Sequence, residues 1–255
     1  HLPLVILAGI VMGAVWGGVV GLIKARTGAH EVILTIMMNY VAANILSFLL
    51  KQPFMRQPGT SNPIAPVLEW SATLPRVAGT RLHLGFGLAL LAALGCWWLL
   101  ERTRFGLRLQ AVGLNPDAAA TAGTSVSRVT FTTMALAGGL AGLGGLITVT
   151  APVILTSYPS QLTVSIIGTL GFDAITVALL GRSRPLGVVL AGLLFGALKA
   201  SRTAMVTIAN TPKQLVDLIQ ALIVLFVAAP AFVTWLLPFL RERRVVRTTV
   251  EEAKA

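Results

Sequence analysis

Charged residues are scarce in this chain of 255 residues: Asp, Glu, Lys and Arg together make up 11%, against about 25% in soluble domains. Hydrophobic residues make up 55% of the sequence, and the mean hydropathy is +0.83. This composition excludes a water-soluble globule. A bilayer core about 30 Å thick needs roughly 20 apolar residues per helix. The sequence therefore predicts an all-α polytopic transmembrane bundle with about six or seven membrane segments.

The residues that build common active sites are also nearly absent. The single cysteine, Cys96, lies in an apolar run, so it can form no internal disulfide and has no partner for a metal site. The three histidines, His1, His30 and His83, lie at or near the ends of predicted spans. No Gly-x-x-x-x-Gly-Lys-Ser/Thr phosphate loop occurs. We therefore expect no enzyme activity, cofactor or metal in this chain, and expect any ATP to be used by a partner.

The formal net charge of +11 would point to nucleic acid in a soluble protein. Here the arginines sit in short loops between apolar runs, a pattern typical of membrane topology. The expected surroundings are therefore membrane lipid, with no nucleic-acid partner.

Seven apolar runs are candidate spans: 2–23, 32–50, 84–100, 129–151, 164–181, 186–208 and 215–237. Because cytoplasmic loops carry the Lys/Arg excess, the basic loop after the third run and the basic tail should both lie inside. Four runs separate them, so the parity is consistent. Whether 164–181 spans fully or is re-entrant stays open.

These assignments predict a transmembrane domain over 1–240, with an external loop at 51–83 and a cytoplasmic loop at 101–128. A cytoplasmic basic tail follows at 241–255. Near the outer end of its run, Lys199 is expected to extend toward the interface.

A few polar residues lie inside the predicted spans. Thr35 and Asn39 share one helix face with Ala43 because they are four residues apart. This stripe could line a solute path or could join helices through hydrogen bonds. Asp173 is an acid well inside a run, where it needs a partner or water. It either borders the path or caps a broken helix.

Glycines recur at four-residue spacing in Gly138-x-x-x-Gly142 and Gly192-x-x-x-Gly196. Glycine at this spacing lets helix backbones approach closely. Both pairs are therefore predicted to be packing surfaces.

The loop at 101–128 contains signals for a short helix. Asn115 can cap its start, Pro116 suits the first helical position, and Gly123 suits its end. Gly106 and Gly113 are expected to permit sharp bends on either side. An inside loop with its own ordered helix is suited to contacting another protein, and the predicted contact set is Arg102, Arg104, Gly106, Arg108, Gly113, Asn115, Pro116 and Ala119.

Three segments resemble one family, the permease subunits of bacterial ABC importers of the ribose and branched-chain amino acid type. They are Thr103-Arg-Phe-Gly with Ala111-Val-Gly-Leu-Asn-Pro-Asp-Ala-Ala, Glu31-Val-Ile-Leu-Thr-Ile-Met-Met-Asn-Tyr, and Gly171-Phe-Asp-Ala-Ile-Thr-Val-Ala-Leu-Leu-Gly-Arg. The last two resemble the nucleoside and simple-sugar branch. The resemblance covers about 9–229, and departs from the family at Gln110, Thr121 and Thr124.

The resemblance implies a permease in the bacterial inner membrane that works with two cytoplasmic ATPases, a second permease subunit in a homodimer or heterodimer, and an external solute-binding lipoprotein. Family members carry further N-terminal spans, so a chain that begins at His1 is expected to be a truncated fragment. The predicted function is import of a nucleoside or simple sugar, with ATP on the partner subunit. The alternatives are an ABC permease for another small polar solute, such as a branched-chain amino acid, or an ion-coupled secondary carrier.

Overall fold

The computed structural model describes residues 1–60, 62–76, 82–151, 161–164 and 170–208, with isolated positions between 212 and 225. It divides into two compact units, His1–Gly168 and Thr169–Ala255. The predicted run 215–237 and the tail 241–255 lie outside the described residues, apart from those isolated positions.

The first unit is helical. Its elements are α1 (Leu2–Thr27), α2 (Glu31–Lys51), the short 3-10 helix η1 (Trp70–Ala72), α3 (Leu84–Arg102), α4 (Arg104–Leu114), α5 (Pro116–Thr121) and α6 (Val126–Thr150). Among the described residues, four helices are long and apolar enough to cross a membrane, namely α1, α2, α3 and α6. The first four predicted spans are therefore confirmed as helices.

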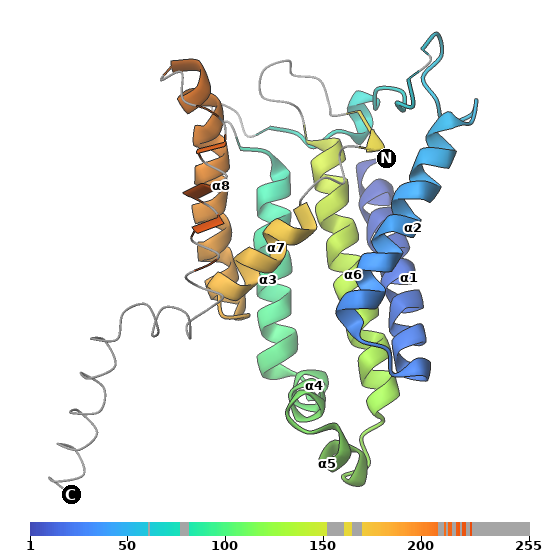
Figure 1. Ribbon diagram of the computed structural model, residues 1–255, viewed down its shortest axis with the longest axis vertical. Helices are drawn as coiled ribbons and strands as arrows, with labels where there is room; N and C mark the ends of the chain where they lie inside the picture. Colours follow the sequence, from blue (N-terminus) through green and yellow to red (C-terminus); the bar gives the residue numbers. More distant parts are fainter. Residues whose placement is uncertain are drawn as a thin grey trace, which may run out of the picture. The chain divides into compact units, whose positions relative to one another are not determined.

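The centre of this unit is the contact between α1 and α6, which run side by side in Figure 1. A Cβ atom placed on Gly13 would lie 2.4 Å from the carbonyl oxygen of Gly138, and one on Gly138 would lie 2.3 Å from that of Gly13. Gly17 and Gly142 are equally close to the opposite backbone. The helices therefore touch backbone to backbone, and the predicted packing role of Gly138 and Gly142 is confirmed.

The two ends of the first unit differ. At one end, two backbone hydrogen bonds hold the segment after α2. The N–H of Leu74 donates to Thr150 O at 3.1 Å, and the N–H of Ala65 donates to Leu162 O at 3.0 Å. The opposite end carries α4 and α5 (Figure 1). The loop predicted to be external and the loop predicted to be cytoplasmic thus lie at opposite ends. Which end faces the cytoplasm stays a prediction.

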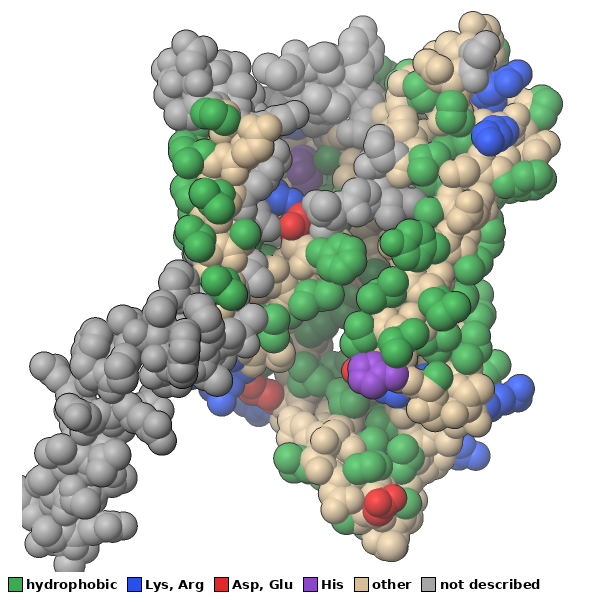
Figure 2. All heavy atoms as spheres, in the orientation of Figure 1, with side chains coloured by type: hydrophobic (Ala, Val, Ile, Leu, Met, Phe, Trp, Pro, Cys, Tyr) green, Lys and Arg blue, Asp and Glu red, His purple; other side chains and the backbone are tan. Residues whose placement is uncertain are grey.

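Large hydrophobic side chains cover the outside of the long helices. Figure 2 shows them along the length of α2 and of α8. In α2, Val32, Ile33, Val41 and Ile45 are all exposed, although they are spread over more than half of the helix circumference. Such a wide apolar surface is stable in lipid or against another membrane helix, and unstable in water.

The second unit contains α7 (Leu170–Leu180) and α8 (Pro185–Ile208) among its described residues. With 11 residues, α7 is about 16 Å long, too short to cross a bilayer core. The described part of the run 164–181 is therefore a short helix, while 165–169 lie outside the described residues. With 24 residues, α8 is about 36 Å long.

The turn between α7 and α8 is unusually tight. A Cβ on Gly187 would lie 2.2 Å from Gly181 O, so the two helix ends meet through their backbones. Between them, Arg182 and Ser183 adopt left-handed conformations, with φ of 52° and 54°. The N–H of Ser183 donates to Ala178 O at 2.8 Å, which closes the end of α7. This geometry reverses the chain within four residues of the helix end.

Candidate functional site

The predicted cytoplasmic loop contains two helices, of which the sequence reasoning identified only the second. The first, α4, begins at Thr103, whose hydroxyl accepts from the N–H of Gly106 at 3.2 Å and donates to Leu99 O at 2.5 Å. This one side chain therefore ends α3 and starts α4. A threonine directly before a glycine-containing amphipathic stretch is the signal that could have located α4.

The predicted role of Gly106 and Gly113 as bends is wrong. Both lie inside α4, and neither has a positive φ. A Cβ on Gly106 would lie 2.2 Å from Leu100 O, so this glycine is needed where α4 passes the end of α3. A Cβ on Gly113 would meet nothing within 4 Å. The chain turns between α3 and α4 at Thr103, without a glycine.

The second helix, α5, starts and ends as predicted. The Asn115 side-chain oxygen accepts from the N–H groups of Asp117 and Ala118, both at 3.0 Å, with Pro116 at the first helical position. At the other end Gly123 has φ 81°, and its N–H donates to Ala120 O at 2.9 Å. Local hydrogen bonds therefore close both ends of α5, so the segment has a fixed shape.

The outer face of α4 combines apolar and basic side chains. Leu107 and Leu114 are seven residues apart on one helix face and are 69% and 89% exposed. Arg104 and Arg108 are exposed beside them. The third predicted arginine, Arg102, instead lies over the ring of Trp97, 5.6 Å from its centre.

The inner face of the α4–α5 segment is anchored to the rest of the unit. Gln110 Nε2 donates to Leu100 O at 3.4 Å, and Ala119 is buried. Ala119 is therefore a packing residue of α5, and a bulky side chain there would displace the helix. Leu107 and Leu114, which the sequence reasoning did not select, are the residues that form an exposed apolar surface on α4.

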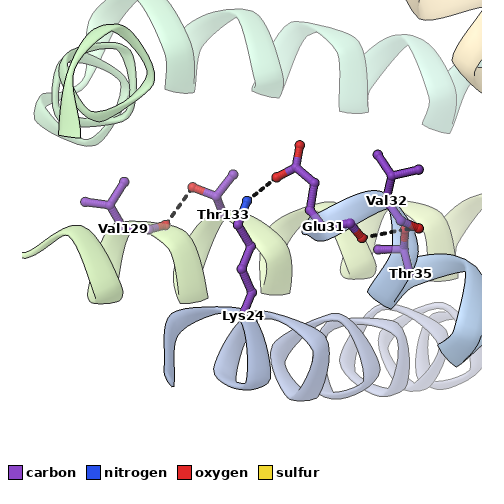
Figure 3. A network of polar contacts seen from close by, with 6 residues as sticks. All are labelled: Lys24, Glu31, Val32, Thr35, Val129 and Thr133. Atoms are coloured by element: carbon purple, nitrogen blue, oxygen red, sulfur yellow. Dashed lines mark hydrogen bonds and ion pairs between the residues drawn. The ribbon is translucent and has the colours of Figure 1, made fainter. Parts of the chain in front are cut away.

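The two polar residues of the predicted path in α2 differ. The Thr35 hydroxyl donates to the carbonyls of Glu31 and Val32, at 2.9 and 3.0 Å, so it is satisfied within its own helix (Figure 3). Asn44 likewise donates to Tyr40 O at 2.8 Å. Asn39 is exposed, and its side-chain amide makes no hydrogen bond to another described residue. Asn39 is thus the residue of this stripe that could bind a solute.

Asp173, the third predicted path residue, has a charged partner. Its Oδ2 lies 2.5 Å from Lys199 Nζ on α8. Lys199 therefore extends to Asp173, a pairing that the sequence reasoning missed. Asp173 belongs to the second unit, whereas Thr35 and Asn39 belong to the first.

Within the described residues, no group of three or more His, Cys, Asp or Glu side chains could hold a metal ion. The arrangement is that of a helical membrane protein with a structured extramembrane segment and isolated polar positions inside its helices.

Comparison with known proteins gives the family. The model of the family described as "Branched-chain amino acid transport system / permease component" matches residues 1–228. The chain belongs to this permease family. It is accordingly a membrane transport component and a multi-pass protein of the inner membrane. No solved structure gives a significant match.

Three curated relatives match most of the chain. The guanosine ABC transporter permease NupP of Bacillus subtilis is 34% identical over 95% of this permease and 69% of its own length. The nucleoside ABC transporter permease NupB of Lactococcus lactis is 32% identical over 93% of this permease and 66% of its own length. The glucose ABC transporter permease TsgB13 of Haloferax volcanii is 32% identical over 91% of this permease and 62% of its own length. The chain thus spans about two thirds of the length of these relatives.

Proposed function

We propose that this permease is a subunit of an ABC importer that carries a nucleoside or a simple sugar across the inner membrane. The names of its relatives support this class of solute, since they refer to guanosine, to nucleosides and to glucose. The importer would include cytoplasmic ATPase subunits, a second permease subunit and an external solute-binding lipoprotein. ATP would be hydrolysed by the partner and not by this chain.

The observation that carries this proposal is the structured segment α4–α5. A loop that only followed the positive-inside rule would need no caps, whereas Thr103 and Asn115 each bond the first turn of a helix. A helix pair of fixed shape can transmit a movement of a soluble partner to α3 and α6, which it connects. Leu107 and Leu114 would supply the apolar contact, and the neighbouring arginines would orient the partner.

For the solute path, we propose Asn39 on α2 and Asp173 on α7. An amide both donates and accepts hydrogen bonds, so Asn39 can exchange bonds with the hydroxyl groups of a passing solute. Thr35 would contribute little, because its hydroxyl is already bonded to α2.

Two other functions compete with this one. The family description names branched-chain amino acids, so leucine is an alternative solute. An ion-coupled carrier would need no ATPase at all. An uptake assay distinguishes both alternatives from the proposal. It measures uptake of guanosine, glucose and leucine into liposomes that contain the permease with or without its ATPase. We expect uptake of guanosine or glucose that requires both the ATPase and ATP. Uptake driven by an ion gradient without the ATPase would refute the proposal.

The coupling role of α4–α5 is tested in the same liposomes with Asn115→Ala. Loss of this cap costs a helix about 1 kcal/mol, so we expect weaker co-purification with the ATPase and reduced solute-stimulated ATP hydrolysis. Asn115→Asp is the matched control, because it keeps an oxygen that can accept from Asp117 and Ala118. Wild-type coupling in Asn115→Ala would show that this segment is not the ATPase contact.

A further inference from the structure

The pair formed by Asp173 and Lys199 lies far from both ends of α8. Lys199 follows the start of this helix at Pro185 by 14 residues and precedes its end at Ile208 by nine, which is about 21 and 14 Å at 1.5 Å per residue. A bilayer core is about 30 Å thick. Wherever a spanning α8 sits along the membrane normal, the two charges are therefore within or at the edge of the hydrocarbon.

Helix packing alone does not account for two charges at this depth. Replacing a buried ion pair by apolar side chains of similar volume is often neutral or stabilising. The chain also packs helices without any charge, as α1 and α6 do through Gly13 and Gly138. Ionisable residues inside a membrane protein by default mark a functional site. The pair therefore calls for a ligand.

The two side chains are also accessible. The Asp173 side chain is 20% exposed and the Lys199 side chain 42%. A carboxylate offers about four acceptor positions and an ammonium group three donors. A carboxylate and an ammonium group in contact can thus be bridged by a ligand whose neighbouring groups both donate and accept.

We propose that Asp173 and Lys199 together bind two neighbouring hydroxyl groups of the solute's sugar ring. One hydroxyl donates to the Asp173 carboxylate, and the adjacent one accepts from the Lys199 ammonium group. This inference rests on the proposed function, because ribose and hexose rings share such a diol. It assigns Lys199 to the solute path.

The chain provides a matched control in a second pair, Lys24 and Glu31, at the turn between α1 and α2 (Figure 3). The same two types of group are in contact, but they lie at the ends of their helices. Neutralising this pair by Lys24→Met with Glu31→Gln changes the same charges near the membrane surface.

The test uses the intact transporter, with its ATPase and lipoprotein, in liposomes. Uptake of guanosine is compared with uptake of 2′,3′-dideoxyguanosine, which lacks both ring hydroxyls. A site that bonds a hydroxyl rejects the analogue without it, so we expect the wild type to have at least about a tenfold lower KM for guanosine. In Asp173→Leu with Lys199→Met, which leaves no side-chain group that can bond a hydroxyl at either position, the ratio of the two KM values should fall several-fold. The Lys24→Met, Glu31→Gln control should keep the wild-type ratio.

The exchange variant, Asp173→Lys with Lys199→Asp, covers the case in which the neutral variant fails to insert. Hydroxyls can donate or accept in either order, so this variant should retain the guanosine preference. An unchanged KM ratio in the neutral variant, or loss of the preference in an inserted exchange variant, would overturn the inference. Wild-type uptake of leucine without any uptake of guanosine or glucose would instead refute the proposed function. The two failures are therefore distinguishable.

Discussion

The contact between α1 and α6 and the contact between α7 and α8 achieve close helix packing by different means. In the first, glycines on both helices face each other over several turns. In the second, the backbones meet only at the turn, through Gly181 and Gly187, and an ion pair joins the helices farther along. The α1–α6 contact thus excludes side chains along most of its length, while the α7–α8 contact keeps a pair of charged side chains between its helices.

This difference predicts where each pair is sensitive to mutation. The α1–α6 contact depends on the absence of side-chain atoms, so added volume should break it. The α7–α8 contact depends on a strained turn and on charge, so backbone conformation and ionisation should matter more there.

The largest effect is expected from Gly138→Leu in α6. Its Cβ would lie 2.3 Å from Gly13 O, and neither backbone can move aside without separating the helices. Overpacking typically costs about 1 to 3 kcal/mol, and a clash with backbone should reach or exceed the upper end. Gly145→Leu is the control on the same helix, because its Cβ meets nothing within 4 Å. Thermal unfolding in detergent should show a lower Tm for Gly138→Leu alone; equal Tm values would contradict the packing argument.

A smaller effect of opposite sign is expected from Ser183→Gly in the turn between α7 and α8. A left-handed conformation costs an ordinary residue about 1 to 2 kcal/mol, and Ser183 has φ 54°. Glycine removes this strain but loses more entropy on folding, about 0.5 to 1 kcal/mol. The expected net stabilisation is therefore between about 0 and about 1.5 kcal/mol. Ser183→Ala is the matched control: it keeps a Cβ and should gain nothing. A gain as large in the alanine variant would exclude relief of backbone strain as the cause.

Local features of the structure could be predicted from the sequence. Asn115 and Gly123 were expected to start and end a helix, and they do, because a cap involves residues within four positions of each other. Gly138 and Gly142 were expected to pack against a helix, and they do. For the capped helix the chemistry is complete within one short segment; for the glycines the spacing predicted the packing face, but not that α1 is its partner.

Features that depend on a distant partner could not be predicted. The same glycine spacing predicted a contact at Gly196, yet a Cβ there would meet nothing within 4 Å of the described structure. The cost of burying a carboxylate predicted that Asp173 needs a partner. Only the geometry of α7 against α8 identifies that partner as Lys199, 26 residues away. Spacing shows which face of a helix is special, but not what meets it.

The smallest effect concerns His83, which caps α3 at the end of the first unit opposite α4. Its Nδ1 accepts from the N–H of Gly85 at 3.1 Å, and it lines a hollow of about 390 Å³ with Leu82, Phe86, Ala89 and Ile147. Burial, and secondarily the charge of Arg76, lowers the pKa of His83 below its ordinary value. The positive end of the α3 dipole also disfavours a charged imidazole there.

The sign of the pH dependence follows from this lowered pKa. Between the folded pKa and the unfolded value of about 6.5 the unfolded chain binds more protons, so stability rises with pH in that window. The contribution of His83 is therefore fully present above about pH 6.5 and is lost as the pH falls through the lower, folded pKa. A helix cap is worth about 1 kcal/mol, which bounds the loss that the broken bond can cause.

We expect His83→Asn, which keeps a side-chain acceptor without titrating, to reduce the drop in Tm between pH 7.5 and pH 5.5. His30→Asn is the control, because His30 precedes α2 without a side-chain cap bond, and it should leave that drop unchanged. If His83→Asn and the wild type lose the same stability on acidification, protonation of this cap does not contribute to the pH dependence.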